Sequence, residues 1–161
     1  MPHPIDVLTG HHEEGLKQLD ILEQASQELR SHGMSAEALS RVEGATRFIN
    51  TEVRSHNELE EKALFPIVEK TPPLDGPCAV MRQEHLELWA GLDRLQSAIA
   101  AIKDNPEDSR RIQEIVGAAA FVVDYLRNHI AKENNILYPS ARSMLARQQW
   151  QEVARRMGIE L

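Results

Sequence analysis

The sequence predicts an all-α protein, an antiparallel up-down-up-down four-helix bundle with a short C-terminal helix. Hydrophobic residues make up 42% of the chain but aromatic residues only 4%, a balance typical of helical cores built from Leu, Ile, Val and Ala. Glycine and proline are grouped at a few points and divide the chain into four long segments. In each segment apolar residues recur every three or four positions, as in a helix with one buried face. Short connections between four such helices favour an up-and-down bundle.

One domain, residues 1–161, accounts for a chain of this length. We expect the bundle over about residues 5–138 and the short helix over about residues 142–157. The short helix is basic with one apolar side, so we expect it to pack on one end of the bundle. The alternative role for it is contact with a partner or a second copy, and both a monomer and a dimer stay open.

The N-terminal half contains the first two predicted helices. The first begins at Pro4, because proline fits the first helical turn, and it ends at about Ser31, before the stop signal His32-Gly33. The second runs from about Ser35 to the Lys70-Thr71-Pro72-Pro73 segment. Pro66 is expected to bend its last turns, because proline lacks a backbone N–H.

The C-terminal half contains the other two helices of the bundle. The third helix is predicted to start after Asp75-Gly76-Pro77. Asn105 is a favourable N-cap with Pro106 at the first helical position, so we predict that the fourth helix starts there. It should run to about Leu137, ahead of Pro139.

Charge and cysteine content exclude several classes of protein. The chain has 18 Lys and Arg against 25 Asp and Glu, a formal charge of −7, and no basic cluster of the kind that binds nucleic acid. The longest apolar stretch, Ile115 to Val123, is far shorter than the ~20 residues of a membrane-spanning helix. The single cysteine, Cys78, excludes an internal disulfide, and no signal-peptide pattern is recognisable, so we expect a cytoplasmic protein.

A motif occurs twice in the chain. His56-x-x-x-Glu60, followed by Leu64-Phe65-Pro66, corresponds to His129-x-x-x-Glu133, followed by Leu137-Tyr138-Pro139, with an offset of 73 residues. The same 73 residues separate His12 from His85. The bundle is therefore predicted to consist of two copies of one helical hairpin.

The histidines of the repeat are expected to lie in one layer of the bundle. Two residues of an antiparallel hairpin lie at the same height when they are equally far from the turn, and His12 and His56 are centred on Met34, beside a predicted turn. His85 and His129 are centred in the same way on residue 107. Each glutamate follows its histidine by four residues and shares its helix face. Six donor side chains should thus converge: His12, His56, Glu60, His85, His129 and Glu133.

Such a layer predicts a metal site. Two buried carboxylates and four buried imidazoles are unfavourable without partners, and the surrounding Leu and Val side chains supply none. Two cations would compensate, with two histidines each and two bridging glutamates. Nitrogen and oxygen ligands without a thiolate favour iron or manganese, with zinc as a less natural alternative in a bridged pair, and we expect two iron ions with an oxo or hydroxo bridge. The alternative is that these are ordinary core histidines, but two matched copies are hard to obtain by accident.

These residues resemble the hemerythrin family, known in bacteria as the hemerythrin HHE cation-binding domain. The resemblance covers about Asp6 to Pro139 and includes Gly10-His11-His12 and Glu84-His85 beside the repeated motifs. It implies a four-helix bundle with a non-haem di-iron centre. In that centre the six ligands would be four terminal histidines and two bridging glutamates, namely His12, His56, His85, His129, Glu60 and Glu133.

Two positions depart from the oxygen-carrying members. Trp89 stands where they have a further histidine, and Asn134 stands where they have an aspartate. The chain looks instead like the variant with four histidines and two glutamates. That variant is found in bacterial di-iron proteins linked to nitric oxide stress and iron-sulfur cluster repair, and in eukaryotic iron-sensing domains. The repair proteins usually carry paired cysteines as well, and this chain has only one cysteine.

The resemblance implies a protein that binds or reacts with O2, peroxide or nitric oxide in oxidative or nitrosative stress response or sensing. The alternative is iron sensing or handling without chemistry on small gases. Whether the chain is an enzyme stays open, because turnover would require an external electron donor. No flavin or nicotinamide motif is recognisable.

Several residues near the predicted ligands are weaker candidates for a role in the metal site. His12 is preferred to His11 as the ligand because it keeps the register of His85. Tyr125 could hydrogen-bond to a ligand of the metal or be an ordinary core residue, and Trp89 is expected to shield one side of the metal pair. Three glutamates could hydrogen-bond to ligand imidazoles or lie on a solvated helix face: Glu58, Glu61 and Glu84.

Overall fold

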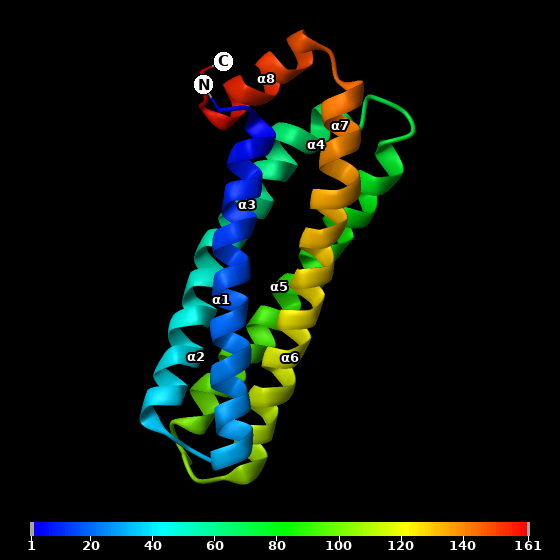
Figure 1. Cartoon of the computed structure of the whole chain (residues 1–161). Helices are drawn as coiled ribbons and strands as arrows, with labels where there is room; N and C mark the ends of the chain where they lie inside the picture. The colour runs from blue at the N-terminus through cyan, green and yellow to red at the C-terminus, as the bar shows by residue number, and fades with distance from the viewer. Residues whose placement is uncertain (1, 161) are drawn as a thin grey trace.

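Four long helices run side by side in the computed structural model, which describes residues 2–160 (Figure 1). The first is α1 (Pro4–His32) and the third is α5 (Asp75–Ile102). The other two contain π-helical segments, labelled η. The second long helix consists of α2 (Ala36–Phe48), η1 (Ile49–Val53), α3 (Arg54–Leu59), η2 (Glu60–Leu64) and α4 (Phe65–Val68). The fourth consists of α6 (Ser109–Lys132), η3 (Glu133–Leu137) and α7 (Tyr138–Met144). The predicted all-α bundle is confirmed.

Local capping explains where the first hairpin turns. The His3 side chain accepts a hydrogen bond from the Ile5 N–H, and Pro4 occupies the first turn of α1. Gly33 ends α1 with φ = 77°, a left-handed conformation that glycine adopts without steric cost. Ser35 then caps α2 by accepting a hydrogen bond from the Ala38 N–H.

The fourth long helix differs from the prediction at both ends. Its N-cap is Asp108, whose carboxylate accepts a hydrogen bond from the Arg110 N–H, and Asn105 lies in the preceding turn. A carboxylate also complements the positive end of the helix dipole, which favours Asp108. At the other end the helix continues past Pro139 to Met144, so the last helix, α8 (Arg147–Met157), starts five residues later than predicted.

The π-helical segments explain how the chain passes its prolines. A proline in a helix lacks an N–H and clashes with the carbonyl four residues earlier. η2 ends two residues before Pro66 and η3 ends two residues before Pro139, and their wider i→i+5 turns displace that carbonyl. The wider turn also changes the helix register. Ile136 follows His129 by seven residues and would share its buried face in an uninterrupted α-helix, but it is 59% exposed.

The core consists of two apolar clusters with the histidine layer between them. The larger cluster fills the bundle from Leu19 to the turn beyond α1, and the smaller one surrounds Phe65, Tyr138 and Trp150. The short helix α8 closes the end where both termini lie (Figure 1), and its Trp150 side chain is buried. Within residues 2–160 no helix has the length and apolar character needed to span a bilayer.

Candidate metal centre

The structure brings all six predicted donors into one buried layer. The four histidines are at most 5% exposed, and Glu60 and Glu133 are fully buried. The ring centroids of His12 and His56 lie 4.7 Å apart, and those of His85 and His129 lie 4.9 Å apart. The donors therefore form two histidine pairs, one containing His12 and His56 and the other His85 and His129.

Each glutamate lies between the two histidine pairs. Glu133 Oε1 is 3.1 Å from His12 Nε2 and 3.1 Å from His129 Nε2. Glu60 Oε1 is 3.3 Å from His56 Nε2 and 3.4 Å from His85 Nε2. Each carboxylate thus touches one histidine of each pair, which is the arrangement that a bridging ligand needs.

Several of these donors lack hydrogen-bond partners. The unpartnered buried atoms in the layer are Glu60 Oε1, Glu133 Oε2, His85 Nε2 and His129 Nε2. All four belong to residues that form one group, in which each residue offers a ligand atom within 4.8 Å of the others, and a second group consists of His12, His56 and Glu133. Buried polar atoms without partners are unfavourable. Because imidazole nitrogens and carboxylate oxygens are also ligands of iron, manganese and zinc, the layer fits a pair of cations.

Burial and mutual attraction shift the pKa values in this layer. Burial alone would lower the pKa of His129, but the Glu133 carboxylate close to its ring raises the pKa to about 9. His12 shows the same balance, and its pKa is also raised. Burial alone would raise the pKa of Glu60, yet the charge of His56 and hydrogen bonds from its neighbours hold it well below its usual value. Without a metal, a protonated His129 therefore balances part of the carboxylate charge, and a bound cation would replace that proton.

Outer hydrogen bonds orient the histidine rings of the second pair. His85 Nδ1 lies 3.0 Å from Glu61 Oε2, and His129 Nδ1 lies 2.9 Å from Glu84 Oε1. Glu84 is also paired with Lys132 at 2.6 Å. A carboxylate partner at Nδ1 fixes the tautomer in which Nε2 is free to bind a metal. Of the three glutamates left open by the sequence, these two contact ligand rings, and Glu58 is exposed.

The first pair has uncharged outer partners. His12 Nδ1 lies 2.7 Å from the Asn134 side-chain oxygen, and His56 Nδ1 lies 3.0 Å from His11 Nδ1. Burial lowers the pKa of His11, which favours its neutral form. His12 rather than His11 faces the layer, in line with the predicted register, and His11 lies behind His56.

Tyr138 is the residue that the sequence analysis missed. Its hydroxyl donates a 2.7 Å hydrogen bond to Glu60 Oε2, and its ring is parallel to that of His12 at 5.3 Å. Burial and the charges of Glu133 and Glu60 raise the pKa of Tyr138 well above its ordinary value. Tyr125, which was considered for such a role, donates its hydroxyl to Glu87 instead. The repeat could have pointed to this residue, because Tyr138 occupies in the second copy of the motif the position that Phe65 has in the first.

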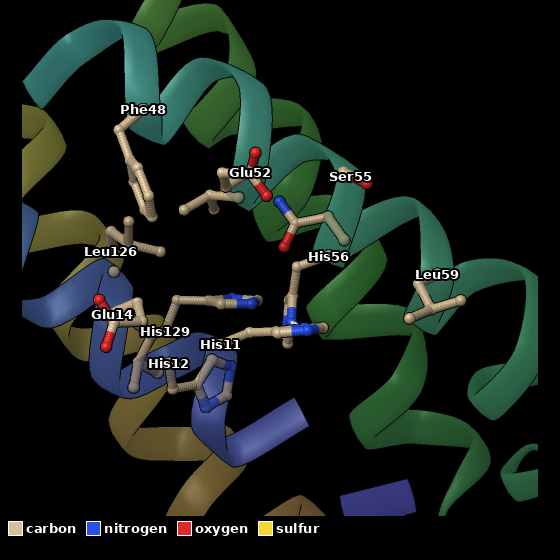
Figure 2. A pocket seen from close by; sticks show the side chains of 14 residues that line it. His11, His12, Glu14, Phe48, Glu52, Ser55, His56, Leu59, Leu126 and His129 are labelled. Atoms are coloured by element: carbon tan, nitrogen blue, oxygen red, sulfur yellow. Dashed lines mark hydrogen bonds between the residues drawn. The ribbon is translucent and has the colours of Figure 1, made fainter. Parts of the chain in front are cut away.

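A cavity of about 360 Å³ reaches the layer from one side. The rings of His11, His12, His56 and His129 gather on one part of its wall, and Phe48 and Leu126 lie on another (Figure 2). Other lining residues include Gly15, Glu14 and Glu52.

The opposite side of the layer is closed. His85 is fully buried, with its ring stacked on Phe65 at 5.8 Å and on Trp89 at 6.1 Å. Trp89 thus covers one side of the donor layer, as its position in the sequence led us to expect.

Comparison with known proteins agrees with this geometry. Residues 3–141 match the family described as hemerythrin HHE cation binding domain. The iron-sulfur cluster repair protein YtfE of Escherichia coli O139:H28 is 28% identical over 141 residues, which are 84% of this chain and 63% of that protein. The protein of the same name from Cronobacter sakazakii is 27% identical over 138 residues, 84% of this chain and 62% of that protein. The chain spans less than two thirds of the length of these relatives. With a family match over nearly all of its bundle, the chain belongs to the hemerythrin HHE cation-binding family.

Proposed function

We propose that the chain binds two iron ions in a carboxylate-bridged centre. Its ligands are the six donors of the layer, with the histidines terminal and both glutamates bridging: His12, His56, His85, His129, Glu60 and Glu133. The observation that carries this proposal is the set of four buried donor atoms without hydrogen-bond partners. The mixed nitrogen and oxygen ligand set and the iron-sulfur repair named for the relatives both favour iron.

We further propose that this centre binds or reacts with O2, peroxide or nitric oxide in the response to oxidative or nitrosative stress. Bound iron supplies ferrous–ferric redox chemistry and an exchangeable ligand position. The cavity beside His12 and His56 supports this proposal, because Phe48, Val53 and Leu126 give it apolar walls that suit small uncharged ligands. Phe65 and Trp89 exclude water from the other side.

Metal analysis tests the iron proposal. Protein prepared with iron should contain about two iron atoms per chain, because the layer offers two groups of donors. Glu60→Ala and Glu133→Ala should each reduce this content, since each removes an oxygen shared by both positions. Glu58→Ala is the matched control, because Glu58 lies on the same helix but is exposed. An iron content of zero or one that neither glutamate substitution changes would contradict the proposal.

Absorption spectra test the proposed reaction with small ligands. The iron-loaded protein should change its spectrum when azide, peroxide or nitric oxide is added, because these molecules reach the His12 and His56 side through the cavity. If the protein has its full iron content and its spectrum responds to none of these three molecules, the proposal of small-ligand binding is wrong, whereas the proposed iron site still stands.

Iron handling is a second candidate function. It is favoured because the buried donors of the layer are unfavourable for folding when no metal is bound. Cations that bind only the folded chain stabilise it by about 2.7 kcal/mol at a concentration 100 times Kd. A chelator should therefore lower Tm by roughly 5–10 °C in a domain of this size. Glu133→Ala should show no such response to the chelator. An unchanged Tm in the wild-type chain would argue against a role in which iron occupancy is sensed through folding.

A further inference from the structure

We propose that Tyr138 is a seventh protein ligand, which binds only the cation held by His12 and His56. The two positions of the centre would then be chemically different, although the helices that build them are repeats. This inference rests on the proposed pair of cations.

The phenolic oxygen lies where a ligand atom should lie. It is 3.4 Å from His12 Nε2 and 3.5 Å from His56 Nε2. Ligand atoms that share a metal at about 2.1 Å lie roughly 3.0–3.4 Å apart for angles between 90° and 109°, so the distance to His12 lies at the upper end of this range and the distance to His56 is 0.1 Å above it. Tyr138 is 1% exposed, so this oxygen cannot turn to solvent for another partner.

The phenol also completes the poorer of the two donor groups. Glu60, His85, His129 and Glu133 form a group of four, whereas His12, His56 and Glu133 form a group of three. Without a cation, Glu60 Oε2, the oxygen that could join the smaller group, accepts the hydrogen bond of Tyr138. With both glutamates bridging and the phenol deprotonated, the cation at His12 and His56 would have five donors from the protein and the other cation four.

The repeat supplies an internal comparison for this role. Phe65 precedes Tyr138 by 73 residues, the offset that relates His12 to His85. The Phe65 ring is stacked on His85 with an interplanar angle of 16°, and the Tyr138 ring is stacked on His12 with an angle of 4°. The two rings therefore occupy equivalent places, and the difference between them is one hydroxyl group.

Ligation exchanges a proton for the metal. The phenolic O–H bond breaks, the oxygen binds the cation, and the proton leaves to solvent. In the metal-free chain the phenol keeps its proton and donates a hydrogen bond to Glu60 Oε2. Two nearby cations reverse that preference, because they outweigh the carboxylates. The trivalent state favours the phenolate most, so the test uses iron oxidised by ferricyanide, which takes up one electron per iron.

Visible absorption and resonance Raman spectra of the ferric protein test this proposal. A phenolate bound to ferric iron gives a visible charge-transfer band and enhanced phenolate vibrations. We expect the band and the vibrations in the wild-type chain. Tyr138→Phe should lack both and keep the same iron content. The chain has only two tyrosines, so Tyr125→Phe is a complete control and should keep both signals.

Iron analysis of the same samples separates the two proposals. A wild-type chain that holds iron but lacks the band, or a band that persists in Tyr138→Phe, would overturn the ligand role of Tyr138 and leave the iron centre intact. A wild-type chain that takes up no iron would overturn both.

Discussion

The two histidine pairs of the centre occupy equivalent places in a repeated structure but have different surroundings. Glu61 and Glu84, which hold His85 and His129, are carboxylates. The residues 73 positions away from them hold the other pair and are uncharged: Asn134 at His12 and His11 at His56. The hydrogen-bond pattern is therefore repeated, and only its charge differs.

Access differs in the same direction. Both His12 and His56 line the cavity, whereas only His129 of the other pair does, and His85 is fully buried under Phe65 and Trp89. An anionic partner makes an imidazole a stronger metal ligand. For the proposed iron centre we therefore expect tighter binding of the cation at His85 and His129, and exchange of small ligands at the cation beside His12 and His56. The two halves of the repeat thus share their donor residues and differ in the residues behind them.

The largest expected effect concerns the outer carboxylates. Glu84→Gln keeps the size of the side chain but removes its charge, so it should weaken binding of one of the two iron ions by about 10–100-fold. Asn134→Ala removes an uncharged partner and should weaken binding less. Competition with a chelator measures both affinities. Equal losses in the two variants would show that the charge of the outer partner does not distinguish the halves.

Closing the cavity should slow ligand binding without removing iron. A Cβ atom at Gly15 would meet only Val53 Cγ2, at 3.7 Å, so Gly15→Leu places a side chain within the cavity. A steric barrier of about 1.4 kcal/mol would slow azide binding roughly tenfold. Gly44→Leu is the matched control, because a Cβ there meets nothing within 4 Å. Stopped-flow absorption measures the rate, and an unchanged rate in Gly15→Leu would place the entrance elsewhere.

The smallest effect comes from making the two halves more alike. Phe65→Tyr adds a hydroxyl beside His85, and its phenolate should increase the visible charge-transfer absorption of the ferric protein about twofold, because both cations then carry equivalent ligands. Absorption per iron atom measures this change. An intensity equal to that of the wild-type chain would mean that the two ring positions are not equivalent.

The sequence predicted the six donors because simple geometry fixes them. A spacing of four residues keeps His56 and Glu60 on one helix face, and the positions of the turns set the heights of all four histidines. The order of four amphipathic segments with short connections determined the bundle in the same way. Rules of this kind do not depend on which side chains pack around the donors.

The residues behind the ligands could not be predicted with the same rules. Tyr138 follows Glu133 by five residues, which an ordinary α-helix would turn away from the glutamate. The π-helical turn of η3 changes that register, and nothing in the helical periodicity announces it. Glu61 and Glu84 stayed ambiguous because they lie at the edge of the buried face. There a small rotation of the helix determines whether the carboxylate contacts a histidine ring or solvent.

Anomalous diffraction from crystals of the iron-loaded protein tests the central claim most directly. Data collected at the iron absorption edge should show two peaks in the histidine layer. One peak should lie among Glu60, His85, His129 and Glu133, and the other beside His12, His56 and Tyr138. A single peak, or no peak in this layer while iron is bound elsewhere, would contradict a centre with two different cation positions.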